Sequence, residues 1–315
     1  MKKFDMISMG AALIDMIAHV ERFPVEDDEV FVPKLEISCG GAAANTAVAC
    51  AKLGLNSAFI GKLGIDDEFG KIIIRDFEKT RVDTSLLKYS KEYGTGSCFV
   101  ALSKTGERQL YAHSGAANVL SAEDIKEDEI IQSKILYLSS LKNTEPFIEA
   151  AKIARKCDIP VILNPGMLII EQGFHAIKPL LQLIDIFIFS YKEFSSLLSI
   201  QEPDLPLENI KEKLKELFAL GIRAIVVTMG SKGSALFVHD SDEIALVPSN
   251  KVEVVDTTGA GDAFSAGFMY GFSNKFSFDF NELKAHLAVG NLVAAKCIQQ
   301  IGARNGLPTV DELNI

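Results

Sequence analysis

The sequence VEVVDTTGAGDAFSAGFMYGF, residues 252–272, is the most informative stretch of the chain. An apolar run that predicts a strand ends at Asp256, small residues follow, and an Ala-, Phe- and Met-rich helix is expected to begin near Asp262. Successive small residues let backbone N–H groups converge at a helix N-terminus, where the helix dipole adds partial positive charge. The residues Gly259, Ala260 and Gly261 therefore predict an anion hole made of backbone amides.

Asp262 has two interpretations. An acidic residue in the first helical turn is a common capping device, and capping needs no ligand. Capping does not explain why two glycines and an alanine immediately precede it, so the pattern favours a chemical role. The stretch is not a dinucleotide fingerprint, because Phe264 stands where a third glycine would lie, and the chain contains no G-x-x-x-x-G-K-[ST] P-loop.

Short apolar runs alternate with helical patterns along most of the chain. The runs that predict buried strands are FDMISMG (4–10), AFIGKLG (58–64), KILYLSS (134–140), PVILNPG (160–166), DIFIFS (185–190) and AIVVTMG (224–230). Amphipathic stretches such as 145–157 and 207–220 predict helices between them. This alternation is typical of βαβ units. We therefore expect an α/β fold with a mostly parallel central sheet, whose ligands bind beyond the carboxyl ends of the strands.

Two regions interrupt the alternation. Residues 16–38 and 94–114 predict antiparallel strands with no helix to cover them, and the second region has a turn at 103–106. They could be surface hairpins without a role, or they could form a small sheet that closes over an active site as a lid and excludes water. In the second case the body comprises residues 1–15, 39–93 and 115–315, and the lid comprises 16–38 and 94–114.

A second informative stretch is SCGGAAANTAVACAKLG, residues 38–54. Gly40 and Gly41 precede a predicted helix, and glycines at such a position allow close backbone approach. Asn45 is a polar residue among alanines in the first turns, so it would face a ligand if that end of the helix is open. The alternative is an ordinary alanine-rich helix start, with Asn45 as a cap.

Composition and charge limit the class of protein. The chain has 315 residues, a hydrophobic fraction of 48% and a net charge of −10, with the acidic residues spread along it. Non-specific nucleic-acid binding needs a basic footprint, so it is not expected. Asp5 and Asp15 interrupt the first apolar stretch, which argues against a signal peptide or a membrane span. Five scattered cysteines without a C-x-x-C indicate a reduced, cytoplasmic setting.

The two stretches resemble the two signatures of the ribokinase-like (PfkB) family of carbohydrate and nucleoside kinases. Asp15 after the first strand, GTGSCFVAL (94–102), GERQLYAHSGAANVLS (106–121), VVTMGSKGSALF (226–237) and IGARNGLPTVDEL (301–313) extend the resemblance over nearly the whole chain. It implies a ribokinase-like three-layer sandwich with a small β-sheet lid. It also implies ATP-dependent phosphoryl transfer to a hydroxyl of a small sugar.

The resemblance implies a role for individual residues. Asp262 would be the catalytic base, above an anion hole formed by Gly259, Ala260 and Gly261. It needs a pKa low enough to stay ionised, and nearby N–H donors would help. The acceptor would be bound by Asp15, Gly40, Gly41 and Asn45. The nucleotide would be bound by Ser190, Glu193, Thr228, Gly230 and Lys232. The exposed edges of a lid sheet would also permit a homodimer.

The resemblance further implies metal ions. In the family an Asn-x-x-Glu element orders magnesium, and here it reads Ser190-Tyr191-Lys192-Glu193, so Glu193 carries over while Ser replaces Asn. Glu193 would hold Mg²⁺ through a water molecule. A monovalent cation such as K⁺ would lie among Asp256, Thr258, Cys297, Gln300, Gly302 and Gly306.

The acceptor stays open between two classes. Ribokinases carry an Asn two positions before the first-strand Asp, where this chain has Leu13, and a Glu where it has Ser139 and Ser140. These differences disfavour ribose and favour another sugar, with a nucleoside as the alternative. A non-catalytic sugar or nucleotide sensor is a third hypothesis, against which the intact Asp262 argues.

Overall fold

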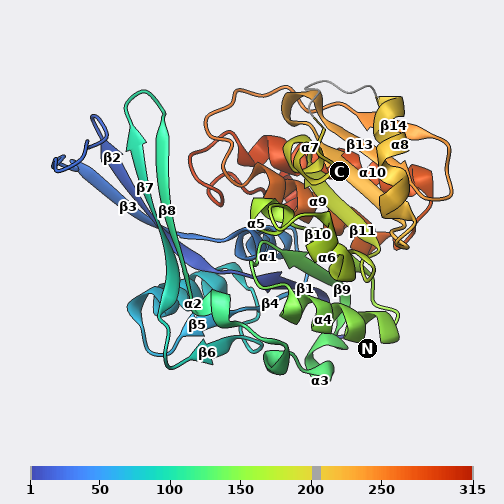
Figure 1. The fold of residues 1–315 in the computed structure, drawn as a ribbon, viewed down its shortest axis with the longest axis horizontal. Helices are drawn as coiled ribbons and strands as arrows, with labels where there is room; N and C mark the ends of the chain where they lie inside the picture. The colour runs from blue at the N-terminus through green and yellow to red at the C-terminus, as the bar shows by residue number, and fades with distance from the viewer. Residues whose placement is uncertain (1, 201–206, 314–315) are drawn as a thin grey trace.

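The computed structural model describes residues 2–200 and 207–313, and an eight-stranded sheet lies at its centre (Figure 1). The strand order is β14-β13-β12-β11-β10-β9-β1-β4. All neighbours are parallel except that β13 runs antiparallel to both β12 and β14. The strands are β1 (Phe4–Gly10), β4 (Ser57–Ile60), β9 (Ser133–Ser139), β10 (Val161–Asn164), β11 (Ile186–Ser190), β12 (Ala224–Thr228), β13 (Ser234–Val238) and β14 (Ile244–Val247).

Helices cover both faces of this sheet, because its strands are apolar on both sides. In β9, for example, Ile135 and Tyr137 are buried in the core on one face, and Leu136 and Leu138 in the core on the other. The first face is covered by α1 (Ala42–Lys52), α2 (Glu68–Thr80), α9 (Ala260–Asn274) and α10 (Phe280–Cys297). The second is covered by α3 (Glu127–Ile130), α4 (Glu145–Lys156), α5 (Gly166–Ile170), α6 (Phe174–Leu181), α7 (Tyr191–Leu197) and α8 (Leu207–Phe218).

A separate four-stranded sheet projects from the body at the left of Figure 1. Its order is β3-β2-β7-β8, with β2 (Leu13–Val20), β3 (Lys34–Gly40), β7 (Thr95–Ser103) and β8 (Arg108–Gly115). Both hairpins are antiparallel, and β2 joins them by pairing in parallel with β7. The turn expected at 103–106 is present, since the Gly106 N–H donates to the Ser103 carbonyl at 3.0 Å. That this sheet acts as a lid stays a prediction.

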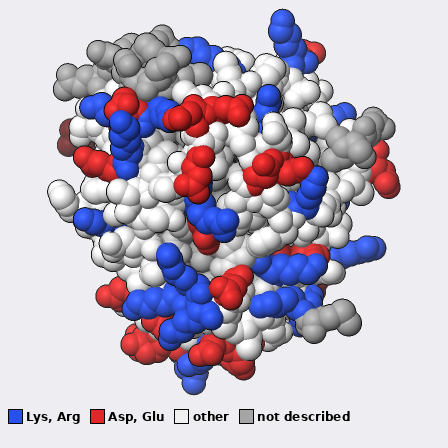
Figure 2. Space-filling model, turned by 90° about the vertical axis from the view of Figure 1, so that its right-hand side faces the viewer, with Lys and Arg blue, Asp and Glu red and all other residues white. Residues whose placement is uncertain are grey.

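The remaining regular structure is short. A two-stranded sheet pairs β5 (Lys62–Gly64) with β6 (Lys88–Ser90). Four 3₁₀ turns are η1 (Ala116–Val119), η2 (Ala122–Asp124), η3 (Gly230–Lys232) and η4 (Val310–Glu312). In the described part of the chain, no helix is long and apolar enough to cross a membrane. On the face turned away from the small sheet, acidic and basic side chains are interspersed (Figure 2), as expected from charges spread along the sequence.

Two local expectations are wrong. The run 252–256 forms no strand: Val254 and Val255 are 55% and 53% exposed, and the N–H groups of Val255 and Asp256 bond to the Ile298 carbonyl beyond α10 rather than to a sheet edge. Helix α9, in contrast, begins at Ala260, near Asp262 as expected, after Gly259 in a left-handed conformation (φ 78°). The run 58–64 is divided at Gly61 between β4 and β5, which belong to different sheets.

Candidate active site

The loop before α9 has the geometry expected of an anion hole. A Cβ on Gly259 would lie 2.7 Å from Ala303, so this position needs glycine for its conformation and for its close approach to the backbone of residue 303. Among the described residues, the N–H groups of Gly261 and Asp262 donate no hydrogen bond. Gly261 is exposed, and a Cβ there would meet open space. Two N–H groups of a helix N-terminus are thus available to an anion.

Asp262 lies deep among protein atoms, although part of its surface stays accessible. Its Oδ2 accepts a hydrogen bond from Nδ2 of Asn45 at 2.9 Å, which joins the start of α9 to the start of α1. Burial raises the pKa of Asp262 to about 7, while Asn45 and the charge of Arg304 oppose the rise and the charge of Glu193 adds to it. The Asn45 donor lowers this pKa, as expected of an N–H donor, but desolvation outweighs it, so the pKa is raised rather than low.

Asp15 lies within β2 rather than beyond the end of the first strand. Burial raises its pKa to about 6, and the charge of Arg304 opposes the rise. In the described parts of the chain, no hydrogen bond or ion pair reaches its carboxylate. A partly buried carboxylate without donors is costly unless a ligand supplies them, which is consistent with the predicted contact to acceptor hydroxyls.

The glycine pair is explained by close contacts. A Cβ on Gly40 would lie 2.1 Å from Oδ2 of Asp15, so the carboxylate occupies the space that a side chain would need. Gly41 begins α1 with φ 96°, and a Cβ there would lie 2.4 Å from the Ala11 carbonyl. Both glycines therefore let α1 and β3 approach β2, which brings the segments of Asp15 and Asn45 together.

A cavity of about 540 Å³ lies beside this loop. Four of the predicted residues line it: Thr228, Gly230, Ala260 and Gly261. The other lining residues are Ser231, Gly233, Ser249, Asn250, Lys251, Val252, Val254, Thr257, Phe264, Asn291, Ala294, Ala295 and Ile298. The cavity is mainly apolar, with the amides of the α9 N-terminus at one side, which suits a nucleotide base and its phosphates. Lys232 follows Gly230 in η3, but it is not among the lining residues.

Ser190 and Glu193 lie at the adjacent strand end. Ser190 is paired with Thr228 across β11 and β12, and it begins α7. The two residues form a capping box: Oε2 of Glu193 accepts from the Ser190 N–H at 2.7 Å and from its hydroxyl at 2.9 Å. Capping accounts for both residues without a metal. The charge of Glu193 nevertheless raises the pKa of Asp262, so the two carboxylates interact electrostatically.

The residues predicted to hold a monovalent cation lie close together, beside the loop that precedes α9. Asp256 accepts from the Thr258 N–H at 2.9 Å, the Thr258 hydroxyl at 2.7 Å and the Gly302 N–H at 2.8 Å. These donors lower its pKa against the effect of burial. The Cys297 thiol lies 3.9 Å from the Thr258 carbonyl, and a Cβ on Gly306 would lie 2.2 Å from the Cys297 carbonyl. The Gln300 N–H faces the same carbonyl at 3.5 Å.

Sequence reasoning missed the residue that connects these parts. Arg304 donates from Nε to Oδ1 of Asn45 at 2.8 Å and pairs through Nη1 with Asp76 on α2. Its side chain is only 11% exposed. Its position within IGARNGLPTVDEL carries no local pattern, so only the folded chain shows that it meets Asn45.

Asn291 is a second residue of the site that the sequence analysis did not single out. It lines the cavity and donates to the carbonyls of Val247 and Pro248 at 3.1 and 3.2 Å.

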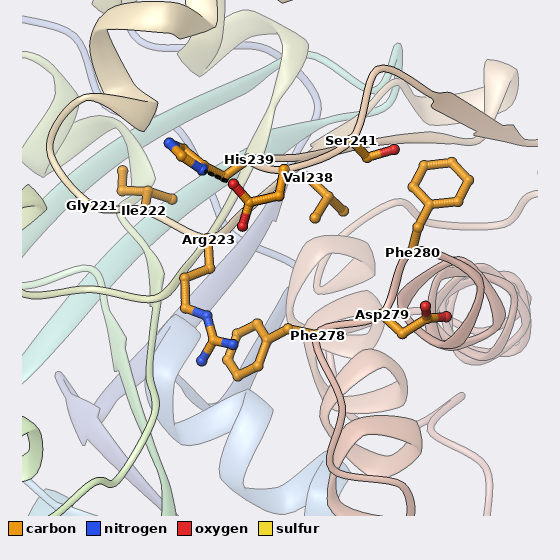
Figure 3. Close-up of a pocket in the computed structure, with 10 residues that line it drawn as sticks. Gly221, Ile222, Arg223, Val238, His239, Ser241, Phe278, Asp279 and Phe280 are labelled. Carbon is orange, nitrogen blue, oxygen red and sulfur yellow. Dashed lines mark hydrogen bonds and ion pairs between the residues drawn. The ribbon is translucent and has the colours of Figure 1, made fainter.

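A second hollow, of about 620 Å³, lies away from this site (Figure 3). It is bordered by Arg223 just before β12, His239 just after β13 and Phe278 before α10. The Arg223 guanidinium lies 3.3 Å from the centre of the Phe278 ring, and His239 Nδ1 lies 2.7 Å from Oδ1 of Asp240. This hollow is at the amino end of a parallel strand, opposite to the end where α/β sheets bind ligands, so it is not part of the candidate site.

Comparison with known proteins agrees with this architecture. The pfkB carbohydrate kinase family matches residues 3–310. An uncharacterized sugar kinase of Archaeoglobus fulgidus is 31% identical over 82% of this chain and 97% of that protein. A ribokinase of Haemophilus influenzae is 30% identical over 96% of this chain and 95% of its own. The structure of Arabidopsis thaliana ribokinase complexed with ribose and ATP matches with a TM-score of 0.87 and 27% identity, over 99% of this chain and 97% of that one.

These matches confirm the predicted ribokinase-like fold, a three-layer sandwich with a mostly parallel central sheet and a smaller second sheet. The match to the family covers nearly all of the described residues, from before β1 to the last 3₁₀ turn. The chain belongs to the pfkB family of carbohydrate kinases.

Proposed function

We propose that the protein transfers the γ-phosphoryl group of ATP to a hydroxyl of a small sugar, with Asp262 as the general base. Membership of the family makes the chain an ATP-dependent kinase with an alcohol group as acceptor. The proposed roles of the individual residues rest mainly on the position of Asp262. Its carboxylate lies at the N-terminus of α9 beside two N–H groups without acceptors, between the 540 Å³ cavity and the segment of Asp15 and Asn45.

In the proposed reaction, Asp262 accepts the proton of the acceptor hydroxyl as its oxygen attacks the γ-phosphorus. A new O–P bond forms, the bond from the γ-phosphorus to the bridging oxygen breaks, and ADP leaves. The N–H groups of Gly261 and Asp262 would donate to the phosphoryl oxygens as negative charge develops, without needing to reorganise. Because such transition states are loose, positioning and charge stabilisation contribute most of the rate enhancement.

Two metal ions are proposed to assist. Mg²⁺ on the ATP phosphates would neutralise charge in the transition state, and Glu193 would hold one of its waters. The carbonyls of Thr258 and Cys297 together with Asp256 offer oxygen ligands, which hard cations prefer, so this cluster fits K⁺. Because Asp256 bonds to Thr258 and Gly302, an ion there would stiffen the loop that leads to the anion hole.

We expect kcat to be higher in a potassium buffer than in a buffer with a bulky organic cation. The cation would balance the charge of Asp256 and fix residues 257–261, whose amides act in the transition state. The melting temperature should also rise with K⁺, because the ion binds the folded state. The comparison is made at constant ionic strength. Equal kcat and equal melting temperature in the two buffers would contradict the cation site.

The acceptor class is tested with a panel of sugars and nucleosides. Asp15 and Asn45 suit a ring with vicinal hydroxyls, since a carboxylate accepts two hydrogen bonds and an amide both donates and accepts. The two relatives described above are named as sugar kinases, which supports a sugar over a nucleoside. Thermal shifts with a non-hydrolysable ATP analogue, followed by product analysis, are expected to select sugars. Phosphorylation of nucleosides alone would favour the alternative acceptor, and binding without turnover would favour a sensor.

The small sheet is proposed to act as the lid and to pair between two subunits in the cytoplasm. Leu35, Ile37, Leu110 and Tyr111 on its outer strands β3 and β8 are exposed, which supports a contact with a second copy. Sedimentation velocity would test the dimer. All five cysteines are free thiols, which fits a reducing compartment.

A further inference from the structure

Arg304 lies where three separate parts of the chain meet. Its Nε donates to Oδ1 of Asn45 at 2.8 Å, its Nη1 pairs with Asp76 on α2, and its Nη2 approaches the Gly40 carbonyl at 3.4 Å. The guanidinium thus contacts α1, α2 and the end of β3 at once. With its side chain 11% exposed, Arg304 is held by these partners rather than by solvent.

This arrangement fixes the orientation of the Asn45 amide. A guanidinium has only donors and a carboxylate has only acceptors, whereas an amide has one end of each kind. Arg304 therefore selects the oxygen of Asn45, which leaves the Asn45 NH₂ group to donate to Asp262 at 2.9 Å. The result is a continuous series of charge-assisted hydrogen bonds from Asp76 through Arg304 and Asn45 to Asp262.

We propose that Arg304 is a positioning residue of the phosphoryl-acceptor site: it orients Asn45, through which it fixes the carboxylate of Asp262. The inference rests on the proposed role of Asp262 as the base. Arg304 does not itself need to touch the acceptor or the nucleotide. Its outer anchor is Asp76, which holds the guanidinium at the angle that directs Nε to Asn45.

The charges around the site support the same role. The charged groups that act on Asp262 are Glu193 from α7 and Arg304, and of the two only Arg304 is a cation. The charge of Asp262 in turn raises the pKa of Tyr137 on β9 and of Cys297 on α10. Burial also raises the pKa of Asp15 on β2, and the charge of Arg304 opposes that rise as well. Without Arg304 two partly buried carboxylates would lose the cation that acts on both, and each would hold its proton to a higher pH.

Arg304→Met is expected to lower kcat/KM for the acceptor by about 10²-fold, because a small misplacement of a reacting group can cost that much. The acid limb of the pH profile of kcat/KM should move to higher pH, since the loss of a cation raises the pKa of Asp262. KM for ATP should stay unchanged, because no described contact of Arg304 involves the 540 Å³ cavity. A merely structural role would not move the acid limb.

Three further variants separate positioning from charge and from folding. Arg304→Lys keeps the positive charge but loses the planar guanidinium. Compared with Arg304→Met, it should return the acid limb of the pH profile to its wild-type position without restoring the value of kcat/KM. Asp76→Asn should weaken the anchor and give a smaller loss. Lys52→Met is the matched control: Lys52 donates to the carbonyls of Arg304 and Leu307 at 3.3 and 3.0 Å, so it holds the same segment without touching Asn45. It should leave kcat/KM and the pH profile unchanged.

The outcomes distinguish this inference from the proposed function. If the wild-type protein phosphorylates an acceptor and Asp262→Asn does not, the proposed function stands whatever Arg304 does. Folded Arg304→Met with a wild-type acid limb and wild-type kcat/KM would then overturn the positioning role alone. If Arg304→Met does not fold, Arg304→Lys and Asp76→Asn test the positioning role instead. Wild-type kinetics in both of these variants would overturn that role. Loss of activity in Lys52→Met matching that in Arg304→Met would reduce the role of Arg304 to holding the segment.

Discussion

Replacing Asp262 with asparagine is expected to lower kcat by about 10²–10⁴-fold, the usual contribution of a positioned general base. The amide has nearly the same shape as the carboxylate and can still accept from Asn45 Nδ2, so the start of α9 should be preserved. What the variant loses is the ability to take the proton of the acceptor hydroxyl. KM for ATP should scarcely change. Steady-state kinetics with both substrates varied would measure this split.

The stability of this variant supplies a control. The pKa of Asp262 is raised to about 7, so the wild-type fold favours the protonated form, and that favourable contribution is lost as the pH rises from the unfolded pKa towards 7. At pH 8 the wild type carries the full cost of a buried charge, whereas asparagine carries none. The melting temperature of Asp262→Asn at pH 8 should therefore be no lower than that of the wild type. Near wild-type turnover in this folded variant would make Asp262 a helix cap only.

Replacing Asp15 with alanine is expected to raise KM for the acceptor by about 5- to 150-fold, equivalent to ~1–3 kcal/mol for hydroxyl groups left without their partner. KM for ATP should stay the same, because a carboxylate would repel the phosphates and Asp15 is not among the residues that line the 540 Å³ cavity. The two constants are measured by varying each substrate at saturation of the other.

A carboxylate elsewhere in the same sheet gives the control for this variant. Glu21 follows β2 at its far end and pairs with exposed Lys104, with 69% of its own side chain exposed. Glu21→Ala removes a charge from the sheet without touching the candidate site, so both KM values should stay unchanged. A rise in KM for ATP with an unmoved acceptor KM in Asp15→Ala would place the acceptor elsewhere.

The central sheet could be predicted from sequence because its strands are buried on both faces. The stretches 135–138 and 186–189 are continuously hydrophobic, a pattern typical of strands that are covered on both faces. The run 252–256 is similar in composition but lies at the surface, where its N–H groups bond to the end of α10. Local composition does not distinguish a strand from a segment that bonds to the end of a distant helix. The expectation of a strand at 252–256 was therefore wrong.

The candidate site was predictable in its residue types but not in its connections. Glycines beside Asp262 and Asn45 indicated both segments, because few other residues permit such close backbone approach. That Asn45 bonds to Asp262, 217 residues away, follows only from the packing of α1 against α9. The high pKa of Asp262 had the same origin: burial is a property of the assembled fold, and its effect exceeded that of the donors that the sequence suggested.

The contact between Arg304 and Asn45 has a consequence for biosynthesis. The two residues are 259 positions apart, so at translation rates of about 5–20 residues per second the ribosome adds Arg304 roughly 13–50 s after Asn45. During that interval the first half of the sheet can form, but Asn45 lacks Arg304, and Asp262, which is itself added only 42 residues before Arg304, has no cation beside it. The Gly302 amide that bonds to Asp256 is equally late. A nascent chain is therefore expected to have much lower kinase activity than the complete chain until residues 302–306 have been added and have packed against α1 and α10.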